Sequence, residues 1–162
     1  MKTILTPVDF SNITDSVVAA AAALARAQNG RVVLLNVTQS PIITSEYAPY
    51  LVNLGEIMLV SEKAGAKQLA RLADRLKAEG IESDTLQFTG PPATQILKQA
   101  EALGADFIVM GSHGHTAFYD LLVGSTTHGV LLKAPCPVLV VPAQKKKVRQ
   151  EKKTSGLMAV HA

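Results

Sequence analysis

The sequence of 162 residues has a single cysteine, Cys136, and no tryptophan. One cysteine excludes an internal disulfide and a cysteine-based zinc finger. Because Cys136 lies between Pro135 and Pro137 ahead of an apolar run, we interpret it as a structural residue and not as a reactive thiol. The chain therefore offers neither a disulfide framework nor evident thiol chemistry.

The sequence also lacks a long apolar run. No stretch approaches the roughly 20 uninterrupted apolar residues of a membrane-spanning helix, and the alanine-rich run of residues 17–24 is soon followed by Arg26. Met1 to Thr3 lead directly into a strand-like segment, which leaves no room for a signal peptide. We therefore expect a cytoplasmic protein without a transmembrane segment.

Charge is distributed unevenly along the chain. The net charge is +3, but residues 145–162 alone carry +5, which leaves −2 for residues 1–144. We expect residues 1–142 to form one domain and residues 143–162 a basic, disordered tail. Two roles for the tail stay open: a solubilising end, or an adaptor that binds nucleic acid or anionic surfaces through residues 145–153.

Strand-like and helix-like segments alternate along residues 1–142. Short apolar or β-branched runs predict strands, and apolar residues at i, i+3, i+4 and i+7 predict helices. This alternation predicts an α/β fold with a doubly wound, five-stranded parallel sheet of strand order 3-2-1-4-5 and helices on both faces. We expect strands at residues 2–8, 31–37, 81–88, 106–110 and 137–141, helices at 13–28, 56–79, 96–103 and 125–133, and a long loop at 38–55.

The ends of the first helix carry recognisable signals. Ser11 or Asn12 can cap its first turn with a side-chain oxygen. Asn29 and Gly30 form a left-handed stop signal at the other end. The first helix should therefore lie between these two signals.

The loop after the fourth strand is the strongest candidate for a binding site, because ligands of doubly wound sheets bind beyond the carboxyl ends of the strands. Gly111 and Gly114 let the backbone approach a ligand and tolerate positive φ angles, and successive amides can form an anion-binding nest. Gly124 and Ser125 then open a helix whose free amides favour phosphate. Alternatively, these glycines are ordinary turn residues.

Other nucleotide-binding signatures are absent from the sequence. There is no G-x-x-x-x-G-K-[ST] P-loop, and no G-x-G-x-x-G fingerprint follows the first strand. The loop after that strand offers Asp9 instead, which could accept a hydrogen bond from a ribose hydroxyl or bind Mg²⁺. Asp9 could equally be a helix-capping residue.

Taken together, these segments resemble the universal stress protein family along residues 1–142. Its ATP-binding branch carries the pattern G-2x-G-9x-G-[ST], which residues 111–125 match without gaps. The tail after Pro142 departs from the family pattern. The resemblance rests on residues 4–11 (ILTPVDFS), 90–92 (GPP), 106–114 (DFIVMGSHG), 124–125 (GS) and 134–141 (APCPVLVV).

The resemblance implies an ATP site with Mg²⁺ and a role for each matching position. Asp9 would lie near the ribose and bind the metal, Pro7 would lie beside the adenine, and the backbone of Val37 would recognise the base. The family also forms homodimers through the last strand. The implied nucleotide-binding residues are Pro7, Asp9, Val37, Met110, Gly111, His113, Gly114, Gly124, Ser125 and Thr126, and the implied dimer residues are Val138, Leu139, Val140 and Val141.

We therefore expect an ATP-binding regulatory protein of the stress response, with little or slow ATP hydrolysis, because the chain shows no complete catalytic set. One alternative is a phosphohydrolase or phosphotransferase in which His113 or His115 acts as a general base or metal ligand. The other is the adaptor that works through the basic tail.

Overall fold

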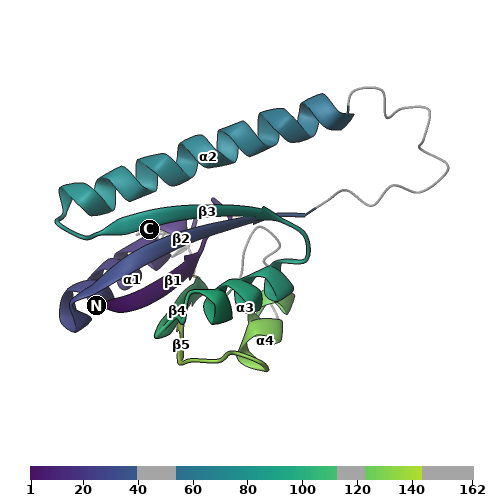
Figure 1. Cartoon of the computed structure of the whole chain (residues 1–162). Coiled ribbons are helices and arrows are strands. Elements are labelled where there is room, and N and C mark those ends of the chain that lie inside the picture. The colour runs from purple at the N-terminus through teal and green to yellow at the C-terminus, as the bar shows by residue number, and fades with distance from the viewer. Residues whose placement is uncertain (40–53, 113–122, 144–162) are drawn as a thin grey trace, which may run out of the picture.

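The computed structural model describes residues 1–39, 54–112 and 123–143. Strands and helices alternate along these residues (Figure 1). The tail and the residues around His113, His115 and Gly114 lie outside the described residues. The elements are β1 (Lys2–Pro7), α1 (Thr14–Gln28), β2 (Gly30–Thr38), α2 (Leu54–Ala78), β3 (Ser83–Thr89), α3 (Pro92–Ala102), β4 (Phe107–Gly111), α4 (Ser125–Leu131) and β5 (Val138–Val141).

The five strands form one parallel sheet in the order β3-β2-β1-β4-β5. This confirms the predicted fold class and strand order. From β1 the chain passes to β2 and then β3 on one side of the sheet. Helix α3 then returns it to the other side of β1, where β4 and β5 lie. The order of the strands therefore reverses at β1, between β2 and β4.

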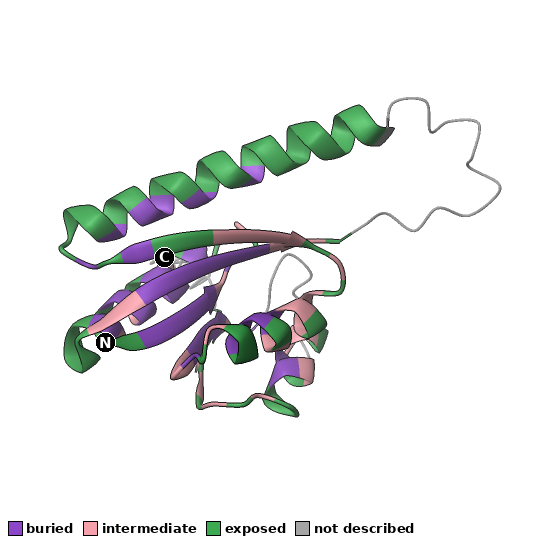
Figure 2. Cartoon of the chain, viewed as in Figure 1, coloured by how far each residue is buried: buried purple, intermediate pink, exposed green. Residues whose placement is uncertain are grey.

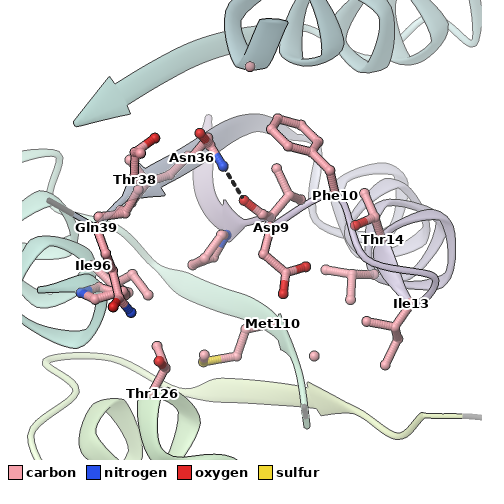
Figure 3. Close-up of a pocket in the computed structure, with 18 of the residues that line it drawn as sticks. Asp9, Phe10, Ile13, Thr14, Asn36, Thr38, Gln39, Ile96, Met110 and Thr126 are labelled. Atoms are coloured by element: carbon pink, nitrogen blue, oxygen red, sulfur yellow. Dashed lines mark hydrogen bonds between the residues drawn. The ribbon is translucent and has the colours of Figure 1, made fainter. Parts of the chain in front are cut away.

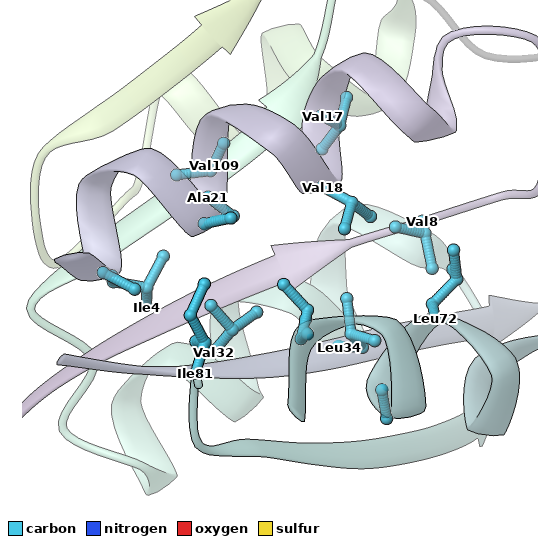
Figure 4. Close-up of a cluster of buried hydrophobic side chains, with 14 of the residues drawn as sticks. Ile4, Val8, Val17, Val18, Ala21, Val32, Leu34, Leu72, Ile81 and Val109 are labelled. Atoms are coloured by element: carbon cyan, nitrogen blue, oxygen red, sulfur yellow. The ribbon is translucent and has the colours of Figure 1, made fainter. Parts of the chain in front are cut away.

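Two hydrophobic clusters, one on each face of the sheet, form the core. On one face, Ile4, Leu34 and Val109 of three neighbouring strands pack with side chains of α1 and α2 (Figure 4). On the other face, Leu5, Val33 and Ile108 pack with residues of α3 and α4. The central strands are buried along their length (Figure 2), as expected for parallel strands covered on both sides.

One predicted helix start and one predicted helix cap were wrong. The third helix begins at Pro92 and not at Ile96, because proline has no N–H and its fixed φ suits the first turn of a helix. The first helix has Ile13 at its N-cap position without a side-chain cap, so neither Ser11 nor Asn12 caps it. Instead, the backbone N–H of Thr14 donates to the Ser11 carbonyl at 3.1 Å. The predicted stop is confirmed at Asn29, which has a φ of 48°.

Within the described residues, the buried hydrophobic side chains of helix α2 all lie in its C-terminal half. Leu69, Leu72 and Leu76 are buried there and belong to the first cluster. In contrast, residues 55–64 are all exposed, and the side chains of Ile57 and Val60 are 63% and 67% accessible (Figure 2). The first turns of α2 therefore add little to the core.

Two titratable groups belong to the fold and not to a site. The Lys2 ammonium bonds one Asp106 oxygen at 2.7 Å and the Thr3 N–H bonds the other at 2.8 Å, and together they lower the pKa of Asp106. Cys136 packs against the second cluster, and its partial burial raises the pKa of the thiol. A raised pKa keeps a thiol protonated and unreactive.

Among the described helices, none is long and apolar enough to cross a membrane.

Candidate functional site

A cavity of about 600 Å³ lies at the carboxyl ends of β1, β2 and β4. Its walls come from the turn after β1, the ends of β2 and β4, the middle of α2 and the starts of α3 and α4. In Figure 3, Asp9, Asn36, Ile96, Met110 and Thr126 surround this space from separate parts of the chain. Both the place in the fold and the volume are typical of a small-molecule site.

The cavity opens where β1 stops pairing with its neighbours. The pairing of β1 with β4 comprises Ile4 with Phe107 and Leu5 with Ile108. Thr3 accepts a bond from the Asp106 N–H, so the odd-numbered residues of β1 face β4. Pro7 is the next odd-numbered residue in line, and it has no N–H to continue the ladder. Pro7 thus ends the contact with β4 at the point where the strand order reverses.

A tight turn follows β1 and presents Asp9 at the cavity. The Ser11 N–H donates to Asp9 Oδ1 at 3.1 Å, and Phe10 has a φ of 60°. A left-handed conformation is uncommon for a bulky residue, and such residues cluster at functional sites. The turn therefore holds the exposed Asp9 carboxylate where a ligand in the cavity can reach it.

The end of β2 carries a buried polar side chain, Asn36. Its Nδ2 donates to the carbonyl oxygen of Val8 at 2.9 Å, the dashed line in Figure 3. Its Oδ1 lies 3.5 Å from the amide nitrogen of Gln87, which also donates to the Glu62 carbonyl of α2 at 3.2 Å. These contacts join the turn after β1 to β2, β3 and α2.

The opposite wall is formed by Gly111 at the end of β4 and by the start of α4. The Thr127 hydroxyl donates to the Gly111 carbonyl at 2.8 Å, and the Gly124 N–H donates to the Ser112 carbonyl at 2.8 Å. Gly124 has an extended backbone, with φ −69° and ψ 161°. Neither Gly111 nor Gly124 is among the described glycines with positive φ. Backbone conformation is thus not the reason for glycine at these positions.

Asp9 is the only charged side chain among the described residues that line the cavity. These lining residues include no lysine or arginine, so backbone N–H groups and hydroxyls would have to hold a phosphate. No group of three or more histidine, cysteine, aspartate or glutamate side chains comes together within the described chain. A lone carboxylate nevertheless suits Mg²⁺, which typically takes one or two carboxylates together with substrate phosphates and water.

The structure brings most of the predicted site residues together. His113 and Gly114 lie outside the described residues, as does His115. Sequence reasoning missed Asn36 and the wall formed by Ser61, Gly65 and Gln68 of α2. The predicted residues that line the cavity are Pro7, Asp9, Val37, Met110, Gly111, Gly124, Ser125 and Thr126.

Gly65 was detectable in the sequence as an isolated glycine inside a helical pattern. A Cβ at this position would lie 2.5 Å from Nε2 of Gln87 and 3.4 Å from Oδ1 of Asn36. Such a glycine often marks close packing, and here it lets α2 approach the ends of β2 and β3.

Comparisons with known proteins agree on one family. The model of the universal stress protein family matches residues 1–142. A universal stress protein of Thermus aquaticus is 35% identical over 146 residues, which cover 86% of this chain and 98% of that protein.

Solved structures show the same fold. The structure of the protein MJ0577 of Methanocaldococcus jannaschii has a TM-score of 0.77 and 29% identity, and the match covers 89% of this chain and 97% of that one. A universal stress protein of Archaeoglobus fulgidus, described in complex with dAMP, has a TM-score of 0.62 at 22% identity, with coverage of 86% and 97%. At that identity the likeness concerns the fold alone.

Proposed function

Since the chain belongs to the universal stress protein family, we propose that it is an ATP-binding regulatory protein of the stress response that hydrolyses ATP slowly or not at all. The observation that carries the proposal is the cavity itself. Asp9, Gly111 and Gly124 come from three distant parts of the sequence and line the same space at the strand reversal. The dAMP-bound relative indicates that this fold can hold an adenine nucleotide.

We propose that the base lies between Pro7, Ile96 and Met110, the apolar part of the cavity. Val37 also lines the cavity, and its backbone would bond the edge of the adenine. A mainly apolar pocket with a few fixed polar groups is typical of small-molecule sites. This end of the cavity would thus supply the preference for a nucleotide over free phosphate.

The phosphates would lie against Gly111, Gly124, Ser125 and Thr126. Glycine leaves the main chain open to close approach, and the hydroxyls of Ser125 and Thr126 can donate to phosphate oxygens. Asp9 faces the same space and would bind Mg²⁺ together with those oxygens. Mg²⁺ would neutralise phosphate charge in a cavity whose described lining holds no basic side chain.

Hydrolysis would be slow because the described lining holds no evident general base besides Asp9. Efficient phosphoryl transfer needs an oriented water, metal ions and cationic groups that stabilise the transition state. The alternative of a phosphohydrolase depends on His113 and His115, which lie outside the described residues.

The direct test is the nucleotide content of the freshly purified protein. We expect acid-denatured protein to release ATP on ion-exchange chromatography, and stripped protein to rebind ATP with a Kd well below 1 mM by calorimetry, because a preformed cavity of this size buries most of a nucleotide. Mg²⁺ should strengthen binding. Protein that carries no nucleotide and shows no ATP binding at millimolar concentration would contradict the proposal.

We further propose that the protein is a homodimer formed through β5. The strand order places β5 at the edge of the sheet, and the side chain of Leu139 is 45% exposed there. An apolar edge strand promotes pairing with another chain, and the family resemblance supports the same residues, Val138 to Val141. We expect wild-type protein to elute as a dimer.

Leu139→Lys should be largely monomeric, because a charge on an edge strand opposes pairing. Chromatography coupled to light scattering measures both masses. Ile57→Lys, on the exposed part of α2, is the matched control and should stay dimeric. A monomeric wild-type protein at micromolar concentration would refute the dimer.

A further inference from the structure

The backbone groups of Val37 point toward β1. Successive residues of a strand direct their N–H and C=O groups to opposite neighbours. The Leu35 carbonyl accepts from the Val8 N–H at 2.8 Å, so Leu35 faces β1. The Thr38 carbonyl accepts from the Gly90 N–H at 2.9 Å, so Thr38 faces the β3 side. Val37, two residues beyond Leu35, therefore faces β1.

Pairing between β1 and β2 stops just before Val37. The last residues in register are Pro7 and Leu35. One further step of a parallel ladder would join the Val37 N–H to the Val8 carbonyl. In the described structure that carbonyl instead accepts from Nδ2 of Asn36 at 2.9 Å. The side chain of Asn36 thus bonds the carbonyl that would otherwise pair with the Val37 N–H. The backbone groups of Val37, a residue that lines the cavity, are then not used in pairing with β1.

The orientation of the Asn36 amide is fixed by its surroundings. Asn36 is 7% exposed, so both ends of its amide need partners inside the protein. The amide nitrogen of Gln87 faces its Oδ1 and is itself held by the Glu62 carbonyl. Gly65 leaves room for this arrangement, because a Cβ there would lie 2.5 Å from Gln87. With its oxygen toward Gln87, the amide must present its N–H group to Val8.

We propose that Asn36 is a positioning residue that determines recognition of the base. By occupying the Val8 carbonyl, it keeps the N–H and C=O of Val37 available to the adenine edge, which offers one ring-nitrogen acceptor beside one amino donor. This inference rests on the proposed ATP site. It adds that the side chain of Asn36 keeps the N–H and C=O of Val37 from pairing with β1, so that they can bind the base.

Asn36→Leu tests the role, since leucine is of similar size but cannot donate. The Val8 carbonyl then pairs with the Val37 N–H, and the base loses its partners. We expect ATP affinity to fall about tenfold, the worth of a typical hydrogen bond, whereas the affinity for inorganic tripolyphosphate stays within about twofold. Asn36→His should retain most of the wild-type ATP affinity, because Nδ1 of histidine lies as far along the side chain as Nδ2 of asparagine and can also donate. Gln28→Leu, at an exposed site, is the matched control.

Hydrogen exchange of the nucleotide-free wild-type protein tests the same inference without any ligand. The Val37 amide should exchange much faster than the Leu35 amide, and Asn36→Leu should slow the exchange of Val37. Equal protection of both amides in wild-type protein would overturn the inference. So would an Asn36→Leu protein that binds ATP like wild type. If wild type binds no ATP but its Val37 amide exchanges fast, the ATP site fails and the role of Asn36 in holding the strands apart stands.

Discussion

Gly124→Val should weaken ATP binding about a hundredfold while the protein stays folded. The extended backbone at Gly124 suits valine, so the fold has no reason to change. The added side chain would stand where the start of α4 borders the cavity and would keep phosphate oxygens away from the nearby N–H groups. Each hydrogen bond to a charged group contributes about 1.5–3 kcal/mol, and two lost bonds correspond to about a hundredfold or more in Kd.

The control for this substitution is Gly55→Val. Gly55 lies on the exposed first turns of α2, with no atom within 4 Å of an added Cβ. Calorimetry with ATP should give the wild-type Kd for this variant. If Gly124→Val binds ATP as tightly as wild type and shows the same circular dichroism spectrum, the phosphates are not held at the start of α4.

Leu34→Ala should lower the free energy of unfolding by about 3 kcal/mol and Tm by about 10 °C. Leu34 lies at the centre of β2, is 0% exposed and belongs to the same buried cluster as Val8, Val18 and Leu72 of three other segments (Figure 4). Shortening it leaves a void that the surrounding sheet and helices cannot fill without moving together. Urea denaturation and calorimetric melting both measure the effect.

Leu132→Ala is the matched control, because the side chain of Leu132 is 68% exposed. It should change the free energy of unfolding by less than about 0.5 kcal/mol. Both melts should be run on stripped protein, because a bound ligand stabilises the native state by mass action. A loss below about 1 kcal/mol for Leu34→Ala would show that β2 is not packed as described.

The fold was predictable because each buried strand is a short apolar run bounded by turn residues. Residues 31–37 and 106–110 are so uniformly apolar that they suit only strands covered on both faces, and the structure places them as β2 and β4. The start of α3 was not found, because Pro91 and Pro92 both break a strand and open a helix. Composition alone does not separate these two effects.

The site was predictable where its residues lie in strand-to-helix connections. Such connections meet at one edge of a parallel sheet, so Asp9, Gly111 and Gly124 converge although they are far apart in sequence. Asn36 and Gly65 escaped prediction for a physical reason. Gly65 stands out as an isolated glycine in a helical pattern, but the pattern does not reveal its role. That role and the role of Asn36 depend on which strand ends where and on how closely α2 approaches, and these are properties of tertiary packing.

The weak attachment of the first turns of α2 has a consequence for ligand exchange. Ser61 and Ala64 form part of the cavity wall, yet they belong to the stretch of α2 in which every residue is exposed. A helix end of this kind frays at a small fraction of the free energy of global unfolding. Transient fraying of these turns would open one side of the cavity while the sheet stays intact. The residence time of a bound nucleotide would then depend on how stably residues 55–64 stay helical, although none of them belongs to either hydrophobic cluster.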